Sequence, residues 1–435
     1  MSGKHSRKRS RTSQLALVAI AVVALLAVAA AGGLYLHGRS QASAEKAAGA
    51  TGSTTPASGV DSQTTQSSSS GAVSSPGAVS SLGASSSTAS TSPFGASAST
   101  TTSLHSPTTS TTARRGYLTV AAGGDVLGDR QVGVFIDKKG GAAVFAGVRP
   151  YLEKADVAFV NLECPVSTKG TAVKTKKYTF RGRPQLVDGL ISAGIDVVSL
   201  ANNHSLDYGT AALLDTVSRL DKAGVAHAGA GANAKAAQAP AILDTPAGTV
   251  AVLAFTDIIP GGFAAGPKTA GVNPASPDRA RVLASIKAAA AKADYVIVSF
   301  HWGIEYTGNA DQDQRELAHE AIDAGADLVL GHHPHVIQGM ELYHNKLVAY
   351  SMGDFVFDHY SRVTGEAYIL QLSLPPQGAP SFEVVPVYLN ESTGVPEPVT
   401  GKAADSILAR LSKLSASLGL QLTRAGDHAV FSGSP

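Results

Sequence analysis

Five apolar runs of the sequence each end in side chains that can bind a metal ion or move a proton. The runs are YLTVAAGGD, DVAFVNLE, DVVSLANNH, YVIVSFHWGIE and DLVLGHHPH. The polar residues at their ends include Asp125, Glu163, Asn202, Asn203, His204, His301, Glu305, His332, His333 and His335. Carboxylates and neutral imidazoles without a thiolate are typical ligands of hydrolytic Zn, Mn or Fe sites. The pattern therefore indicates a metal site.

Each of these clusters also has a structural interpretation when it is taken alone. A Gly-Asp pair such as the one at Asp125 commonly marks a turn. Glu163 could cap a helix or lie on the surface, and His301 could be a core histidine beside an aromatic ring. GHHPH is the most specific cluster, because Pro334 restricts the backbone between two imidazoles. Five such clusters at five successive strand ends favour a shared site over five unrelated features.

The segments between these runs predict the elements that hold them. VFAGVRPYLEKA, QLVDGLISAG and RELAHEAIDAG are amphipathic and predict helices. Apolar strands alternating with helices are typical of an α/β fold with many parallel strands. Ligands of such sheets bind outside the carboxyl ends of the strands, so the five clusters are expected to converge.

The later part of the chain predicts further strands and one long helix. KLVAYSMGDFVFD, EAYILQLSL and FEVVPVYL read as strands that add an antiparallel portion to the sheet system. ADSILARLSKLSASLG is an amphipathic helix, and HAVFS is a candidate last strand. We place one folded domain at residues 116–434.

The first 115 residues predict a membrane anchor and a tether. No charged residue occurs from Thr12 to Leu36, and a helix needs about 20 apolar residues to span a bilayer. We therefore expect a basic cytoplasmic segment (1–13), a transmembrane signal anchor (14–36) and a disordered Ser/Thr/Ala-rich linker (37–115). A signal peptide cleaved near Ala44 is the alternative. The anchor predicts a single-pass protein of the cell membrane with its folded domain outside the cell.

Charge and cysteine content exclude two other kinds of site. The basic residues of the first segment are Lys4, Arg7, Lys8, Arg9 and Arg11. Because the whole chain has a net charge of only +2, the rest of the chain is mildly acidic, which argues against nucleic acid as a partner. Cys164 is the only cysteine, so neither an intramolecular disulfide nor a thiolate zinc cluster can form.

The order of the motifs resembles the CapA family of poly-γ-glutamate capsule biosynthesis proteins, within the calcineurin-like metallophosphoesterase superfamily. The motifs are GGDVLGDR, NLECPVS, YTFRGRP, SLANNHSLDYG, HAGAG, SFHWGIEY, GHHPHVIQG and YSMGDFVFD. The resemblance implies a four-layer α/β/β/α sandwich with two divalent metals, Mn, Fe or Zn, at the strand ends. It also implies a role in making, exporting or anchoring poly-γ-glutamate or a similar anionic polymer, together with other capsule-synthesis proteins.

The resemblance carries roles onto particular residues. The implied metal ligands are Asp125, Glu163 as the bridging carboxylate, Asn203, His301, His333 and His335. His204 resembles the histidine that protonates the leaving oxygen, and Asp207 is expected to orient it. Apart from the resemblance, Arg181 is expected to bind the phosphate or carboxylate of a substrate, whereas Arg183 and Arg130, which could do the same, are expected to be solvated surface arginines. Glu305 is expected to fix the tautomer of His301. His332 is expected to contact the ligand residues and the substrate, and not the metal itself.

The sequence departs from the superfamily pattern at two positions. The superfamily has a histidine two residues after the first aspartate, but this chain has Leu127. An acidic residue normally follows the asparagine-histidine pair, but this chain has Ser205. The first departure predicts that one metal position is weakened.

Three functions fit these residues. The first is a surface-tethered, metal-dependent hydrolase or transferase that acts on a phosphoester or on the amide bond of a polymer. The second is a non-catalytic component of an envelope assembly machine, whose site binds metal and polymer. The third is a structural surface protein with a relic fold, which the complete set of ligand-type residues disfavours because such groups are costly to bury alone.

Overall fold

The computed structural model describes residues 116–433. The predicted basic segment, transmembrane anchor and linker therefore lie outside the described residues. Within residues 116–433, no helix is long and apolar enough to cross a membrane. Strands and helices alternate along the first part of this range, so the predicted α/β class is confirmed.

The larger sheet has ten strands. They are β1 (Leu118–Val126), β2 (Val157–Leu162), β3 (Val197–Ser199), β4 (Ala226–Ala228), β13 (Asp354–Val356), β14 (Glu366–Leu374), β15 (Ser381–Leu389), β16 (Pro396–Pro398), β17 (Thr423–Ala425) and β18 (His428–Phe431). The main order is β17-β18-β15-β14-β1-β2-β3-β4, while β13 pairs with β1 and β16 with β15. β1 to β4 pair in parallel, whereas β1, β14, β15 and β18 pair in antiparallel. The predicted antiparallel portion is therefore confirmed.

The smaller sheet has six strands in the order β11-β12-β10-β9-β7-β6. They are β6 (Ala241–Thr245), β7 (Gly248–Thr256), β9 (Tyr295–His301), β10 (Leu328–His332), β11 (Met340–Tyr343) and β12 (Lys346–Ala349). A separate two-stranded sheet is formed by β5 (Ala230–Gly231) and β8 (Gly271–Val272). The five apolar runs with polar ends are thus divided between two sheets, with β1, β2 and β3 in one and β9 and β10 in the other.

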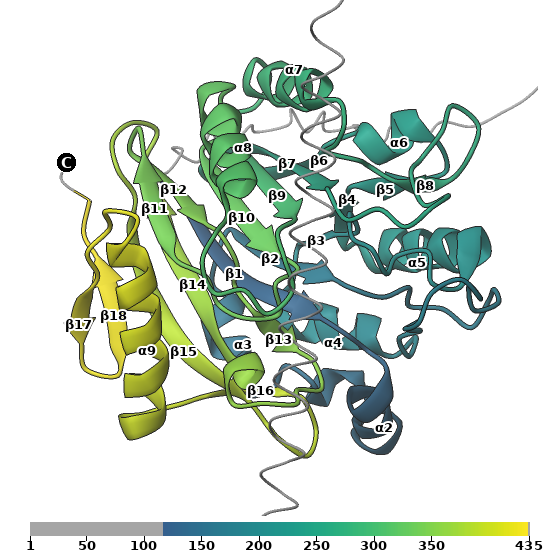
Figure 1. Cartoon of the computed structure of the whole chain (residues 1–435), viewed down its shortest axis with the longest axis horizontal. Coiled ribbons are helices and arrows are strands. Elements are labelled where there is room, and N and C mark those ends of the chain that lie inside the picture. The colour runs from purple at the N-terminus through teal and green to yellow at the C-terminus, as the bar shows by residue number, and fades with distance from the viewer. Residues whose placement is uncertain (1–115, 434–435) are drawn as a thin grey trace, which may run out of the picture. The chain divides into compact units, whose positions relative to one another are not determined.

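Most of the helices cover the outer faces of the two sheets, whereas the last one packs on the inner side of the larger sheet (Figure 1). The helices are α2 (Arg130–Lys139), α3 (Arg149–Leu152), α4 (Leu186–Ala193), α5 (Gly209–Ala223), α6 (Ala234–Gln238), α7 (Arg279–Ala290), α8 (Gln312–Asp323) and α9 (Gly401–Ala416). One apolar core lies between the ten-stranded sheet and α2 to α5, and another lies between the six-stranded sheet and α7 and α8. A third core joins the facing sides of the two sheets and includes residues of α9. Because this core lies between the sheets, the carboxyl ends of their strands can meet.

The helix predicted from residues 144–155 is much shorter than expected. Only α3 forms there, with Pro150 in its first turn. Proline is accepted in the first turn of a helix but breaks a helix interior, so no helix can continue through this position from Val144. The predictions for α4, α8 and α9 are confirmed.

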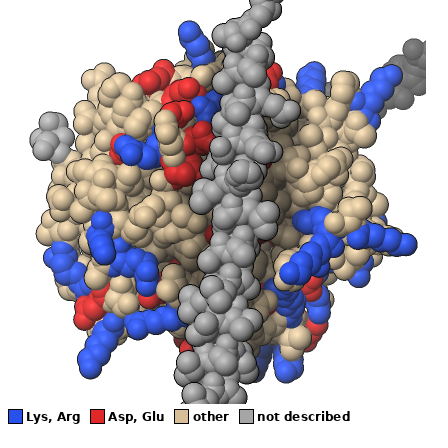
Figure 2. Space-filling model, viewed as in Figure 1, with Lys and Arg blue, Asp and Glu red and all other residues tan. Residues whose placement is uncertain are grey.

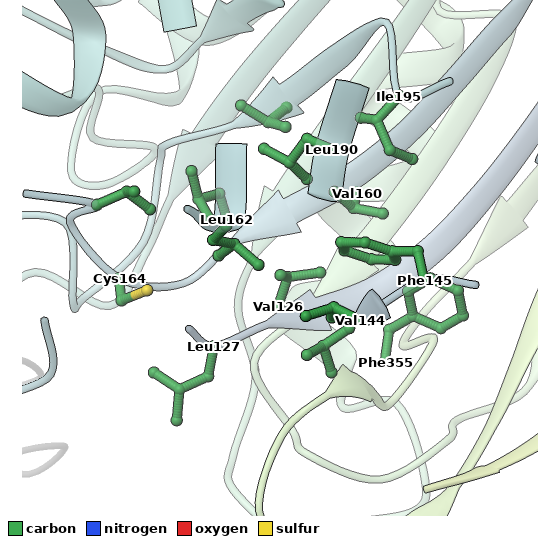
Figure 3. Close-up of a cluster of buried hydrophobic side chains, with 14 of the residues drawn as sticks. Val126, Leu127, Val144, Phe145, Val160, Leu162, Cys164, Leu190, Ile195 and Phe355 are labelled. Atoms are coloured by element: carbon green, nitrogen blue, oxygen red, sulfur yellow. The ribbon is translucent and has the colours of Figure 1, made fainter. Parts of the chain in front are cut away.

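The end of β1 is shaped by a close approach of its backbone to the residue before β13. A side-chain carbon at Gly124 would come within 1.9 Å of the carbonyl oxygen of Gly353. The Asp125 amide donates to that same oxygen at 3.0 Å. Leu127, just beyond β1, is fully buried. It lies with Cys164 in the core between the ten-stranded sheet and α2 to α5 (Figure 3). Leu127 therefore packs as a core residue, while Asp125 stays at the strand end.

Cys164 provides a chemical test of this core. Its thiol is fully buried, and burial raises its pKa to about 12. We expect no reaction with a thiol reagent in the native protein at pH 8, and one thiol per chain after denaturation, because only an exposed thiolate reacts quickly. An absorbance assay with an aromatic disulfide measures both. Rapid labelling of the native protein would contradict the packing around Leu127 and Cys164.

Candidate metal centre

Strand ends from the two sheets bring acidic and histidine side chains together. Asp125 lies near the end of β1, Glu163 follows β2, and His301 and His332 are the last residues of β9 and β10. Nδ2 of Asn161, in β2, donates to Asp125 Oδ1 at 2.8 Å, and His332 Nδ1 of the other sheet lies 3.1 Å from the same oxygen. All five side chains are buried. The predicted convergence of these strand ends is therefore present in the structure.

Three overlapping groups of buried side chains in this cluster could hold a metal ion. They are Asp125 with Glu163 and His301, Glu163 with His333 and His335, and Asp125 with His335 and Asp354. Within each group, one ligand atom from every residue lies within 4.8 Å of the others. Glu163 Oε1 lies 3.7 Å from His301 Nε2 and 4.0 Å from His335 Nε2. Glu163 thus occupies the middle of the cluster, where the resemblance expects the bridging carboxylate.

The GHHPH segment turns sharply after β10. His333 and His335 have φ angles of 98° and 56°, values that non-glycine residues rarely adopt. The carbonyl of Pro334 accepts from the Tyr306 amide at 2.8 Å, and the His333 amide donates to Asp125 Oδ2 at 3.2 Å. A strained backbone held by its surroundings is a feature of functional sites. Here it directs two imidazoles toward Glu163.

Two consecutive asparagines, Asn202 and Asn203, follow β3 and have different roles. Asn202 Nδ2 donates to Asn161 Oδ1 at 3.1 Å and to the Leu162 carbonyl at 2.9 Å. Its own Oδ1 accepts from the His204 amide at 3.1 Å. Asn203 Oδ1 lies 3.0 Å from His301 Nε2. Asn202 therefore positions the loop, while Asn203 is the amide that faces the group of candidate ligands.

His204 is oriented by Asp207. Its Nδ1 lies 2.6 Å from Asp207 Oδ2, and Lys176 Nζ donates to Asp207 Oδ1 at 2.5 Å. Ser205, which stands where the superfamily has an acidic residue, instead donates to the Leu200 carbonyl at 2.6 Å. Burial lowers the pKa of His204, and Asp207 opposes that effect. The Phe180 ring lies 4.3 Å from the imidazole, centre to centre.

Asp354 is the main residue of the cluster that sequence reasoning missed. It begins β13, pairs with Asp125 in parallel register, and lies 2.8 Å from His335 Nδ1 through Oδ1. Burial raises its pKa to about 6, although the adjacent His335 lowers it. A signal was present, because Gly353-Asp354 repeats the Gly124-Asp125 pair at the end of an apolar run. Asn161 and Lys176 were also missed.

The three remaining predicted residues lie at different distances from the cluster. His332 belongs to it, with Nδ1 on Asp125. Glu305 is exposed in the wall of the adjacent pocket, whereas the ring nitrogens of His301 face Asn203 and Asn161. The Arg181 guanidinium lies 4.4 Å from the centre of the Tyr208 ring, and Arg181 does not line that pocket. Glu305 therefore lies at the solvent-exposed wall of the pocket, and the expected contact with His301 is made by Asn203 and Asn161 instead.

The polar atoms of the cluster fit a bound cation. Glu163 Oε1, His332 Nε2 and His333 Nδ1 are buried without a hydrogen-bond partner among the described residues. Leaving such an atom unpaired costs about 1–3 kcal/mol, and more for a charged group. Burial and the neighbouring Asp125 raise the pKa of Glu163 well above its usual value. Oxygen and imidazole donors without sulfur suit Zn, Mn or Fe, so the residues present fit the implied metal.

A pocket of about 240 Å³ opens beside the cluster. His204, His335 and Asp354 form part of its wall, and five aromatic residues contribute to the remainder. The aromatic residues are Tyr178, Phe180, Tyr306, Phe357 and Tyr360. A ligand in this pocket would therefore contact both the candidate metal ligands and His204.

Comparisons with known proteins show the family of this chain. The profile described as "Bacterial capsule synthesis protein PGA_cap" matches residues 119–359. The chain belongs to this family. It is 34% identical to the PGA biosynthesis protein CapA of Bacillus subtilis over 292 residues. The alignment covers 67% of this chain and 76% of that protein. The predicted family is therefore confirmed.

Two further relatives and one solved structure are also similar. The capsule biosynthesis protein CapA of Bacillus anthracis is 34% identical over 290 residues, covering 65% of this chain and 70% of that protein. A probable polyglutamine synthesis accessory protein of Mycobacterium tuberculosis is 35% identical over 231 residues, covering 50% and 60%. A hypothetical protein from Thermus thermophilus has a TM-score of 0.35 and 20% identity, covering 64% of this chain and 96% of that one.

Metal binding to this capsule-synthesis family member should release protons at neutral pH. Burial lowers the pKa of His335, but the charge and hydrogen bond of Asp354, with Glu163 and Asp125, outweigh it and raise the pKa to about 10. His335 is then protonated at pH 7 and must lose its proton to bind a metal. Affinity is therefore expected to fall as the pH is lowered below about 10.

Calorimetric titration of the metal-free protein with Zn²⁺ or Mn²⁺, in two buffers with different ionisation enthalpies, measures this release. We expect about one proton or more per ion at pH 7. Heats that do not depend on the buffer would contradict the assignment of His335 as a ligand.

Proposed function

We propose that this protein is a metal-dependent hydrolase or transferase that acts in the biosynthesis, export or anchoring of poly-γ-glutamate or a related capsule polymer. The observation that supports it best is the buried Glu163 carboxylate, whose Oε1 has no hydrogen-bond partner among the described residues and which lies among three histidines. Membership of the capsule synthesis family and the names of the Bacillus relatives support the polymer. The resemblance to the calcineurin-like superfamily supports a dinuclear site of Mn, Fe or Zn.

The predicted ligands, with Asp354 added, fall into overlapping groups. Asp125, Glu163 and His301 would hold one ion, with Asn203 beside His301, and Glu163, His333 and His335 would hold another, while Asp354 joins Asp125 and His335. Bound divalent ions supply Lewis-acid polarisation of a phosphoryl or carbonyl oxygen.

The proton is handled by His204. With Nδ1 donating to Asp207, the other ring nitrogen is available to a ligand in the pocket that His204 lines. The imidazolium form, which Asp207 stabilises, would give its proton to the leaving oxygen or nitrogen. Lys176 pairs with the other oxygen of Asp207 and keeps its carboxylate in place, while burial, together with the charge of Lys176, lowers the pKa of His204 so that its proton is readily given up. Such general acid catalysis contributes about 10²–10⁴-fold to a rate.

We also propose the location and partners of the protein. Residues 14–36 would anchor the chain in the cytoplasmic membrane, with residues 116–434 outside the cell. Its partners would then be the surface polymer and other capsule-synthesis proteins, and not nucleic acid. Lys and Arg lie around the margin of one face and Asp and Glu gather near α8, so charges of both signs are present on that face (Figure 2). This mixed distribution is consistent with a partner other than nucleic acid.

A non-catalytic role in binding metal and polymer is the second candidate. Leu127 favours it, because this residue lies in the apolar core where the superfamily has a histidine ligand. The His204–Asp207 pair favours the enzyme, because metal binding alone does not need a histidine held by a carboxylate at 2.6 Å.

Replacing His204 separates the two candidates. His204→Ala should abolish surface polymer in cells that lack the native gene, while the purified variant keeps its metal, since the proton donor is lost and the ligands are not. Polymer is measured by acid hydrolysis and amino-acid analysis of washed cells, and metal by elemental analysis.

His227→Ala is the matched control, because His227 is a partly buried histidine of β4 that bonds Asp221 away from the cluster. It should leave both polymer and metal unchanged. Normal polymer with His204→Ala would reject catalysis and favour the binding role.

A further inference from the structure

The pocket beside the metal centre combines a single cationic side chain with apolar walls. Its lining contains one Lys or Arg residue, Arg130, together with the five aromatic residues named above. Three of the aromatic residues are largely exposed at its rim, namely Tyr178 (53%), Tyr306 (60%) and Tyr360 (75%). Exposed tyrosines at the mouth of a concave site are common in ligand recognition, because they offer a rigid face and a polar tip.

Arg130 is held in a defined position. It starts α2 with a φ of 50°, which is rare for a residue with a side chain. Its guanidinium carbon lies 4.5 Å from the centre of the Phe180 ring and 5.7 Å from that of Tyr178. Nη1 donates to Asp358 Oδ2 at 3.1 Å and to Tyr360 Oη at 2.6 Å. Among residues 116–433, the hydrogen bonds of this side chain all leave from Nη1, so its Nε and Nη2 edge can bind a ligand.

Backbone strain is concentrated around this pocket. Of the six non-glycine residues of positive φ among residues 116–433, four lie in the site, namely Arg130, Tyr306, His333 and His335. The other two, His344 and Asn345, form the turn between β11 and β12, where such angles are ordinary. Because strain costs of order 1–3 kcal/mol per residue, its presence at Arg130 and Tyr306 indicates that their positions serve the ligand.

The balance of charge limits what the pocket can accept. Its three carboxylates are Glu305, Asp354 and Asp358, of which Asp354 pairs with His335 and Asp358 with Arg130. One arginine beside three carboxylates suits a single negative charge better than a polyphosphate. The aromatic walls suit the methylene groups beside that charge.

We propose that this pocket binds one acidic unit of an amide-linked chain, with its free carboxylate on Arg130, its methylenes between the tyrosines and its backbone amide facing His204. This inference rests on the proposed function and names the substrate class of the same site. Arg130 is then the residue that distinguishes an acidic chain from a neutral one.

Binding of tri-γ-glutamate to the Mn²⁺-loaded full-length protein tests the proposal, measured by calorimetry beside the fully amidated peptide. We expect Arg130→Gln to weaken the acidic peptide about tenfold or more and to leave the metal content unchanged. The amidated peptide should bind the native protein about tenfold more weakly than the acidic one. Arg183→Gln is the matched control, because Arg183 is exposed to a similar degree and pairs with Asp129 and Asp137 instead. It should bind as the native protein does.

Equal binding of the acidic peptide to Arg130→Gln and to the native protein would overturn the proposal and leave the proposed function standing. Equal binding of the acidic and amidated peptides would do the same. Displacement of the peptide by inorganic phosphate at lower concentration than by acetate, in an Arg130-dependent way, would reassign the pocket to a phosphate. No binding of tri-γ-glutamate to the native protein would reject both the proposal and the polymer named in the proposed function.

Discussion

The structure depends on keeping three carboxylates close together in the protein interior. Asp125, Glu163 and Asp354 are all buried, and Asp125, near the end of β1, pairs in register with Asp354, the first residue of β13. Buried like charges repel and lose their hydration, so carboxylates in such a position need cations or protons. The histidines meet part of this need, since His332 contacts Asp125 and His335 contacts Asp354. Glu163 Oε1 is left without a partner among the described residues, and a divalent cation would remove that deficit.

The two sheets serve this constraint. Neither sheet alone carries the cluster, because the acidic residues come from β1, β2 and β13 and the histidines from β9 and from the end of β10. The apolar core between the sheets brings the two sets of strand ends to one edge. Gly124 lets β1 approach the residue before β13, which sets Asp125 beside Asp354. The burial of apolar side chains between the sheets thereby offsets the cost of holding three carboxylates close together.

Much of this arrangement could be predicted from the sequence, and the exceptions have physical reasons. Asp125, Glu163 and His333 are predictable because each follows an apolar run, and the carboxyl ends of parallel strands share an edge. Asp354 was missed although Gly353-Asp354 repeats the Gly124-Asp125 pair, because that local signal does not show that β13 returns from the second sheet to pair in parallel with β1. Lys176 lies in a polar stretch without periodicity, so nothing nearby indicates its contact with Asp207. The division of the five strands between two sheets likewise depends on packing between distant segments.

The central claim is that the buried carboxylates and histidines hold divalent metal. Elemental analysis of the purified full-length protein after reconstitution with Mn, Fe and Zn tests it most directly, beside a His333→Ala, His335→Ala double variant and a His344→Ala control. His344 is an exposed histidine of the β11–β12 turn, outside the cluster. We predict about two ions per chain in the native protein and in the control, and fewer in the double variant with its circular dichroism unchanged. A native protein that retains no metal with any of the three ions would contradict the account.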